Sequence, residues 1–110
     1  MAIPILPVRD LTEAAVLWTG AGLTVEPYDE GYAFVLADGR EVVHLDLHTA
    51  VDPATNPCAC YIHVDDVHEW HARLTEAGLP VTPVRHEPWG MAEFSVRDPS
   101  GNLVRVGRPL

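Results

Sequence analysis

The sequence contains an internal repeat, in which residues 6–27 align with residues 62–83 at a constant offset of 56 positions. Nine of the 22 aligned positions are identical, whereas chance at ordinary composition would give about one or two. Numbered in the first copy, the shared residues are Val8, Asp10, Glu13, Thr19, Ala21, Gly22, Leu23, Val25 and Pro27. Two copies in a chain of 110 residues indicate a duplicated supersecondary unit, which strongly limits the folds open to this chain.

Each copy begins with a short apolar run that is followed by a helix start signal. The signal is Asp-x-x-Glu, beginning at Asp10 and at Asp66, in which the aspartate caps the helix and the glutamate completes a close relative of the capping box. Each helix should end at Ala-Gly-Leu, because Gly22 and Gly78 can adopt the positive φ of the C′ position. Apolar residues recur at helical spacing between these signals, so each helix should pack on a core.

Further strands follow each helix. We expect strands over residues 32–36 and 41–47 in the first half, and over 92–96 and 103–106 in the second half, with turn sequences between them. Opening runs at 3–8 and 60–64, and extended segments through Val25 and Val81, complete a β-α-β-β-β order in each half. The sequence therefore predicts an α+β fold of two repeated modules with curved mixed sheets. Module one covers about 1–48 and module two about 58–110, joined by a linker of about 49–57.

Alternation within the expected strands separates an apolar face from a mixed face. The apolar set includes Val43, Leu45, Phe94 and Val104, and it should face the helices. The mixed set should lie on the opposite face, which is solvated or, if the sheet curves, lines a cleft. Its members are His44, Asp46, Tyr61, His63, Glu93, Ser95 and Arg105.

The acidic composition excludes one class of function. Sixteen acidic residues against seven basic ones give a formal net charge of −9, which opposes nucleic-acid binding and would attract a cationic partner. No apolar run approaches the roughly 20 residues that span a bilayer. With two cysteines and no export signal, we expect a cytoplasmic protein that binds neither nucleic acid nor membrane.

Trp89 is the strongest candidate for a ligand contact. It lies in the loop Pro88-Trp89-Gly90, outside any periodic pattern, whereas Trp18 and Trp70 occupy helical core positions. A flat ring in such a loop can stack on a planar heterocycle. Tyr61, on the mixed face, is the second aromatic candidate.

The paired modules and several motifs resemble the vicinal oxygen chelate superfamily, which comprises glyoxalase I, extradiol dioxygenases, fosfomycin-resistance enzymes and bleomycin-resistance proteins. The resemblance covers essentially the whole chain. Its most specific parts resemble the bleomycin-resistance branch: Pro88-Trp89-Gly90, Glu93-Phe94, Arg97-Asp98-Pro99, Gly101-Asn102, and the start Pro4-Ile5-Leu6 with Arg9-Asp10-Leu11. The resemblance implies a homodimer in which the first strand is exchanged between subunits at a proline hinge.

The enzymes of this superfamily hold a divalent metal through four side chains. The resemblance places these positions at Ile3, His44, Ala59 and Arg105, of which His44 alone is a residue type that binds metals. A slip of one or two residues in the first strand would offer Pro4 or Ile5 in place of Ile3, and neither binds metals. The chain is therefore expected to have neither a metal site nor a cofactor. A zinc cluster in the segment 58–63 is not expected either, because strand alternation directs its two cysteines away from its histidine and towards a helix.

The resemblance and the mixed face favour non-catalytic sequestration of a bleomycin-like or other planar, cationic antibiotic, for resistance or self-protection, in crevices at a dimer interface. Two alternatives remain open. One is a metal-dependent enzyme of glyoxalase or dioxygenase type with a non-standard ligand set, in which His44 could pair with Glu93 or Asp46 for acid–base chemistry. The other is a dimeric binding module for an unrelated small metabolite. The candidate ligand-binding residues are Trp89, Tyr61, His44, Asp46, His63, Glu93, Ser95 and Arg105.

Overall fold

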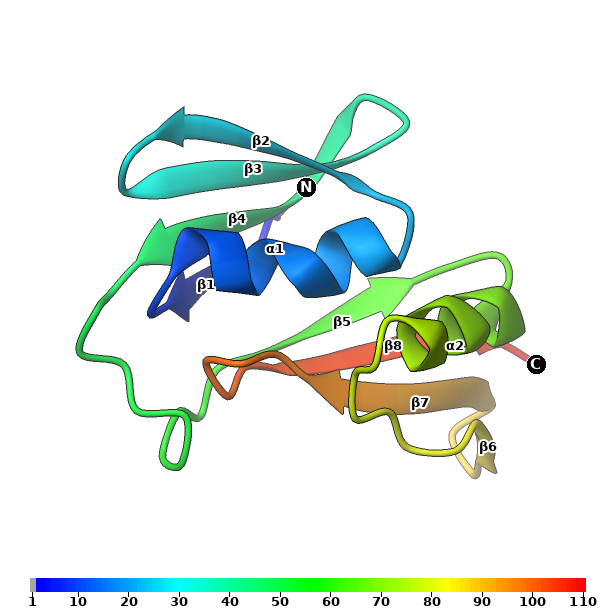
Figure 1. Ribbon diagram of the computed structural model, residues 1–110. Coiled ribbons are helices and arrows are strands. Elements are labelled where there is room, and N and C mark those ends of the chain that lie inside the picture. Colours follow the sequence, from blue (N-terminus) through cyan, green and yellow to red (C-terminus); the bar gives the residue numbers. More distant parts are fainter. Residues whose placement is uncertain (1) are drawn as a thin grey trace.

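The computed structural model describes residues 2–110, and two halves of the chain repeat the same order of elements (Figure 1). The first half contains β1 (Ile5–Val8), α1 (Leu11–Gly20), β2 (Thr24–Asp29), β3 (Tyr32–Ala37) and β4 (Arg40–Leu47). The second half contains β5 (Ala59–His63), α2 (Val67–Glu76), β6 (Arg85–Glu87), β7 (Met91–Arg97) and β8 (Leu103–Pro109). The two β-α-β-β-β modules predicted from the repeat are therefore confirmed.

Each module builds its own four-stranded mixed sheet. The strand orders are β1-β4-β3-β2 and β5-β8-β7-β6, so the first and last strands of each module are parallel neighbours and the other pairs are antiparallel. Helix α1 packs on the first sheet and α2 on the second, and the two helices contact each other (Figure 1). We call the face of each sheet that turns away from the helices its open face.

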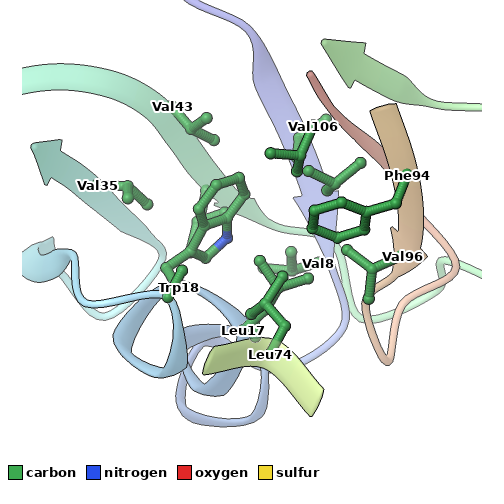
Figure 2. Packing of buried hydrophobic residues seen from close by; sticks show 14 of the residues in the cluster. Val8, Leu17, Trp18, Val35, Val43, Leu74, Phe94, Val96 and Val106 are labelled. Carbon is green, nitrogen blue, oxygen red and sulfur yellow. The ribbon is translucent and has the colours of Figure 1, made fainter. Parts of the chain in front are cut away.

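The core lies on the helix side of both sheets. Val43 and Leu45 of β4 are fully buried there, while the residues between them point to the open face, as the alternation predicts. Full burial of a side chain of this size contributes about 1.5–3 kcal/mol. Cys58 and Cys60 are free thiols that pack, half-buried, against this core. Figure 2 shows core residues of both modules around Trp18, namely Val8, Leu17, Val35, Val43, Leu74, Phe94, Val96 and Val106.

The repeated Asp-x-x-Glu motif starts both helices. The carboxylate of Asp10 accepts a hydrogen bond of 2.7 Å from the backbone N–H three residues on, and Asp66 accepts the equivalent bond of 3.0 Å. Gly22 and Gly78 follow the helix ends with φ of 91° and 82°, as the sequence predicts. Neither helix within residues 2–110 has the length and apolar character needed to cross a membrane.

The prediction of an extended strand through Val81 is wrong, because the segment does not form a regular strand. Val81 makes an isolated bridge to β7, and regular pairing at this edge begins at β6. Prolines at 80 and 83 lack the backbone N–H that a ladder requires. Thr82 replaces the ladder, because its N–H donates to Ser95 O at 2.9 Å and its Oγ1 accepts from Ser95 N at 2.9 Å.

The turn between β7 and β8 fastens the two modules together. Asn102 is fully buried and donates from Nδ2 to the Pro7 carbonyl of β1 at 2.8 Å and to Asp98 Oδ2 at 2.9 Å. Its Oδ1 accepts from Nδ2 of Asn56 in the linker at 2.9 Å. Ser100 Oγ accepts from the backbone N–H that follows β1 at 2.9 Å. We call Asn56, Asp98, Ser100 and Asn102 the intermodule clasp.

Gly101, inside this turn, should tolerate no side chain. Its φ is +85°, and a Cβ there would lie 2.8 Å from Pro53 Cα in the linker. We expect Gly101→Ala to lower the free energy of unfolding by about 2–3 kcal/mol. Gly39→Ala is the matched control, because Gly39 has a φ of +77° but no described atom within 4 Å of its Cβ position, and we expect a loss of about 1 kcal/mol. Urea unfolding measures the free energy of unfolding of both variants. Equal losses would contradict a steric clash between the added Cβ and Pro53.

Candidate binding site

The open face of the second sheet joins three of the predicted site residues in one hydrogen-bonded group. Tyr61 of β5 donates its hydroxyl proton to Glu93 Oε2 of β7, and Trp89 Nε1 donates to the same oxygen at 3.3 Å. Glu93 is 8% exposed, because both rings contact its carboxylate, whereas Trp89 is 60% exposed. Most of the indole surface is therefore free to meet a ligand beside a buried negative charge.

Gly107 gives the Tyr61 ring its place. A Cβ at Gly107 would collide with the Tyr61 hydroxyl and would lie 3.0 Å from Glu93 Cβ. The phenol thus crosses β8 at the one position where that strand has no side chain. Gly107 is not among the predicted site residues, although a glycine within a strand often marks such a close approach.

The Tyr61 hydroxyl is a donor over the whole physiological range. Burial, the hydrogen bond to Glu93 and the Glu93 charge raise the pKa of Tyr61 to about 12, and Arg105 opposes this shift. Because Tyr61 and Trp89 both donate to Oε2, the other oxygen of Glu93 can accept a hydrogen bond from a ligand. The group therefore suits a planar ligand that carries an N–H donor or a positive charge.

The raised pKa of Tyr61 should make the fold sensitive to alkali. The unfolded tyrosine loses its proton near pH 10, so the stability that Tyr61 contributes is present below that pH and is lost as the pH rises to about 12. Burial raises the pKa of Cys60 to about 11, so a second loss should begin near pH 9. We expect Glu93→Gln to lower the pKa of Tyr61 and to flatten the loss between pH 10 and 12. Urea unfolding at several pH values measures this slope, and an unchanged slope in the variant would contradict the coupling.

A cavity of about 360 Å³ opens beside this group. Trp89, Glu93 and Arg105 line it together with Arg85 and Glu87 of β6. Two arginines and two glutamates give this cavity a balanced charge, although the whole chain carries −9. The cavity can therefore satisfy acceptor as well as donor groups of a ligand.

The remaining second-sheet candidates border the same group. Ser95 lines the cavity and lies opposite Arg105 in the strand register. His63 packs its ring on Tyr61 at a centroid distance of 5.0 Å; it lies outside this cavity and lines a separate one of about 390 Å³ that residues of both modules form. Arg85 and Glu87 are not among the predicted ligand-binding residues, because strand β6 itself was not predicted.

His44 and Asp46 lie on the other sheet, in β4, and have different partners from those considered in the sequence. His44 Nε2 contacts Glu41 Oε1 at 2.5 Å, and its Nδ1 contacts the Tyr32 hydroxyl at 2.8 Å. Asp46 Oδ2 contacts His48 Nε2 at 3.1 Å. Within one chain, His44 is therefore hydrogen-bonded to neither Glu93 nor Asp46. A shift in the β3–β4 register brings Glu41 to the face of His44, although the two residues are three apart in a strand.

His44 borders an aromatic cluster that the sequence analysis missed. The Phe34 ring lies 4.9 Å from His44 and 5.8 Å from both Tyr32 and Tyr28, between ring centroids. A cavity of about 320 Å³ is lined by these aromatic residues and Asp29. We call Tyr28, Tyr32 and Phe34 the aromatic patch. The alternation of aromatic and small apolar residues along β3 was the available signal.

The positions implied for a metal do not form a donor set. The register places Ile5 beside His44, which is the slip of two residues left open for the first strand, and Tyr61 beside Arg105, two residues later than predicted. An isoleucine offers no ligand atom and a guanidinium repels a cation. Within the described part of the chain, no three His, Cys, Asp or Glu side chains converge closely enough to hold a metal ion. The residues present therefore do not fit the divalent metal of the related enzymes.

Comparison with known proteins decides the family. The sequence matches the Glyoxalase/Bleomycin resistance protein/Dioxygenase superfamily over residues 4–106. The chain belongs to this superfamily. Among curated members, a bleomycin resistance protein of Klebsiella pneumoniae is 27% identical over 113 aligned positions, which cover 96% of this chain and 89% of the relative.

Solved structures confirm the fold of this superfamily member. A bleomycin-binding protein complexed with bleomycin superimposes with a TM-score of 0.87 at 22% identity, covering 100% of this chain and 98% of the other. The bleomycin-binding protein of the bleomycin producer Streptomyces verticillus, complexed with copper(II)-bleomycin, superimposes with a TM-score of 0.76 at 28% identity. That alignment covers 96% of this chain and 92% of the other. The resemblance to the bleomycin-resistance branch is thus confirmed.

Proposed function

We propose that this superfamily member sequesters a bleomycin-like or other planar, cationic antibiotic without altering it. The observation that carries the proposal is the group of Trp89, Glu93 and Tyr61, in which an exposed indole lies beside a buried carboxylate on the wall of a cavity. The indole stacks on a planar part of the ligand, and the carboxylate accepts from its N–H groups. The names of the relatives support bleomycin as the first ligand to test.

The charges of the two open faces support a homodimer with crevices at its interface. The open face of the first sheet carries the carboxylates Glu26, Asp29, Glu41 and Asp46, whereas that of the second carries the arginines Arg85, Arg97 and Arg105 against the glutamates Glu87 and Glu93. The two cavities described above, beside Trp89 and at the aromatic patch, are open, and neither includes residues of the other sheet. A two-fold dimer that sets the first sheet of one copy against the second sheet of its partner matches opposite charges and closes two equal crevices.

In this dimer the remaining candidates contribute from both walls. His44 and Asp46 act from the first sheet, and His63, Ser95 and Arg105 from the second, where they meet polar edges of the ligand. Exchange of β1 between copies would preserve its parallel pairing with β4, and Pro4 directly precedes this strand while Pro7 lies within it. We place the protein in the cytoplasm, where the thiols of Cys58 and Cys60 stay reduced.

Mass spectrometry of the drug separates sequestration from catalysis. Bleomycin is incubated with one tenth of its molar amount of protein, the protein is denatured, and the drug is analysed for any change of mass. We expect the drug to be recovered unaltered. At equimolar concentration, the drug should elute together with the protein from a size-exclusion column. Conversion of more than one drug molecule per chain would contradict the proposal and favour an enzyme.

A further inference from the structure

We propose that Tyr32 determines which ligand groups the aromatic patch accepts, and that His44 and Glu41 fix the direction of its hydrogen bond. This inference rests on the proposed binding function and adds a specificity-determining residue on the wall opposite Trp89. The three side chains form a hydrogen-bonded series, with Glu41 Oε1 at 2.5 Å from His44 Nε2 and His44 Nδ1 at 2.8 Å from the Tyr32 hydroxyl. The Tyr32 end of the series lines the cavity of the aromatic patch.

Glu41 decides where His44 carries its proton. A carboxylate at 2.5 Å from Nε2 needs a hydrogen between the two atoms, so Nε2 is the protonated nitrogen of the neutral ring. Nδ1 of that ring then has a lone pair, and Tyr32 must donate its single proton to it. The hydroxyl oxygen then has only its lone pairs available to a ligand in the cavity. Tyr32 therefore presents an acceptor to a ligand, not a donor.

The surroundings reinforce this polarity. Burial, Asp46 and Glu41 raise the pKa of Tyr32, so the phenol stays neutral and keeps the proton that it shares with His44. The charged groups that face Tyr32 and His44 are Glu26 and Asp29 of β2 and Glu41 and Asp46 of β4, with His48 on Asp46, while β1 presents the apolar Ile5. A ligand in the cavity of the patch thus meets acceptors at Asp29 and at Tyr32, while the other carboxylates add negative charge around it. We infer that the patch selects planar cations with N–H donors, such as amidines and amino-heterocycles, over planar cations without them.

The first test uses the ligand-free protein labelled with 15N-histidine. Nuclear magnetic resonance should show the His44 ring at pH 8 as the tautomer protonated on Nε2. We expect Glu41→Gln to give a mixture of tautomers, because an amide can donate as well as accept. A wild-type ring protonated on Nδ1 would overturn the assignment, whether or not any drug binds.

The second test compares two planar cations by the shifts of patch resonances during titration. Benzamidine carries N–H donors, and phenyltrimethylammonium carries the same charge without them. We expect Tyr32→Phe to weaken benzamidine binding about three- to tenfold, as for loss of one hydrogen bond, and to leave phenyltrimethylammonium within about twofold. Equal effects on both probes, or none on either, would overturn the proposal. If benzamidine behaves as expected and bleomycin does not bind, the proposed function fails while the role of Tyr32 stands.

Discussion

Replacing Asn102 by alanine should lower the free energy of unfolding by about 3–5 kcal/mol, the largest stability effect that we expect from a polar residue of this chain. The side chain makes three hydrogen bonds in a fully buried position, to Pro7, Asp98 and Asn56. Its loss leaves these partners without their bonds and removes one side-chain link from module two to the linker and one to β1. Urea unfolding with a fluorescence readout measures the change.

Ser100→Ala is the matched control for this prediction. Ser100 is as buried as Asn102, but its hydroxyl accepts one bond, from the backbone N–H of Arg9, so we expect a loss of about 1 kcal/mol. Equal losses in the two variants would contradict the central part of Asn102 in the clasp.

The clasp also predicts the pH at which the Asn102→Ala defect is greatest. Burial raises the pKa of Asp98, and hydrogen bonds from Asn102 and Ser100 oppose the shift. Without the Asn102 amide, the pKa of Asp98 in the folded state should rise further. At pH values between the unfolded and folded pKa of Asp98, the folded state then binds a proton that the unfolded state lacks. A raised carboxyl pKa gives stability below the unfolded value of 3.8 and loses it as the pH rises through the folded value. The defect should therefore be smaller near pH 4 than at pH 7.

Replacing Trp89 by alanine should weaken the binding of bleomycin by about 10- to 100-fold. The ring is exposed in the free chain, so its removal costs little stability, while the ligand loses its stacking surface next to Glu93. Isothermal titration calorimetry measures the affinity, and thermal unfolding confirms that the variant is folded.

Val16→Ala is the control for Trp89. Val16 is an exposed apolar residue of α1, on the helix side of the first sheet and outside the lining of either cavity. Its replacement should leave the affinity within about twofold, in line with a surface change remote from the site. Wild-type affinity in Trp89→Ala would remove the indole from the binding site.

Most of the fold could be predicted from the internal repeat. The residues shared by the two copies include Asp10, which caps a helix, and Gly22, which adopts a positive φ. Few other residue types can take these positions, so the repeat remained recognisable and predicted the two modules. Alternation along β4 likewise placed His44 and Val43 on opposite faces, because the side-chain period of a strand is two.

The contacts within the site depend on features with no local period. A register shift turns Glu41 towards His44, and Gly107 admits the Tyr61 ring from a neighbouring strand. Both require the pairing of strands to be known first. The irregular segment around Val81 shows the same limit, because its prolines remove ladder bonds that Thr82 then replaces with its side chain.

We propose that this chain binds a bleomycin-like drug in crevices shared by two copies. Calorimetric titration of bleomycin into the purified protein measures this binding. We expect saturable binding with a dissociation constant on the order of micromolar or tighter and one drug per chain, which corresponds to two per proposed dimer. No saturable heat at drug concentrations on the order of a hundred micromolar, with the protein shown to be folded, would contradict it.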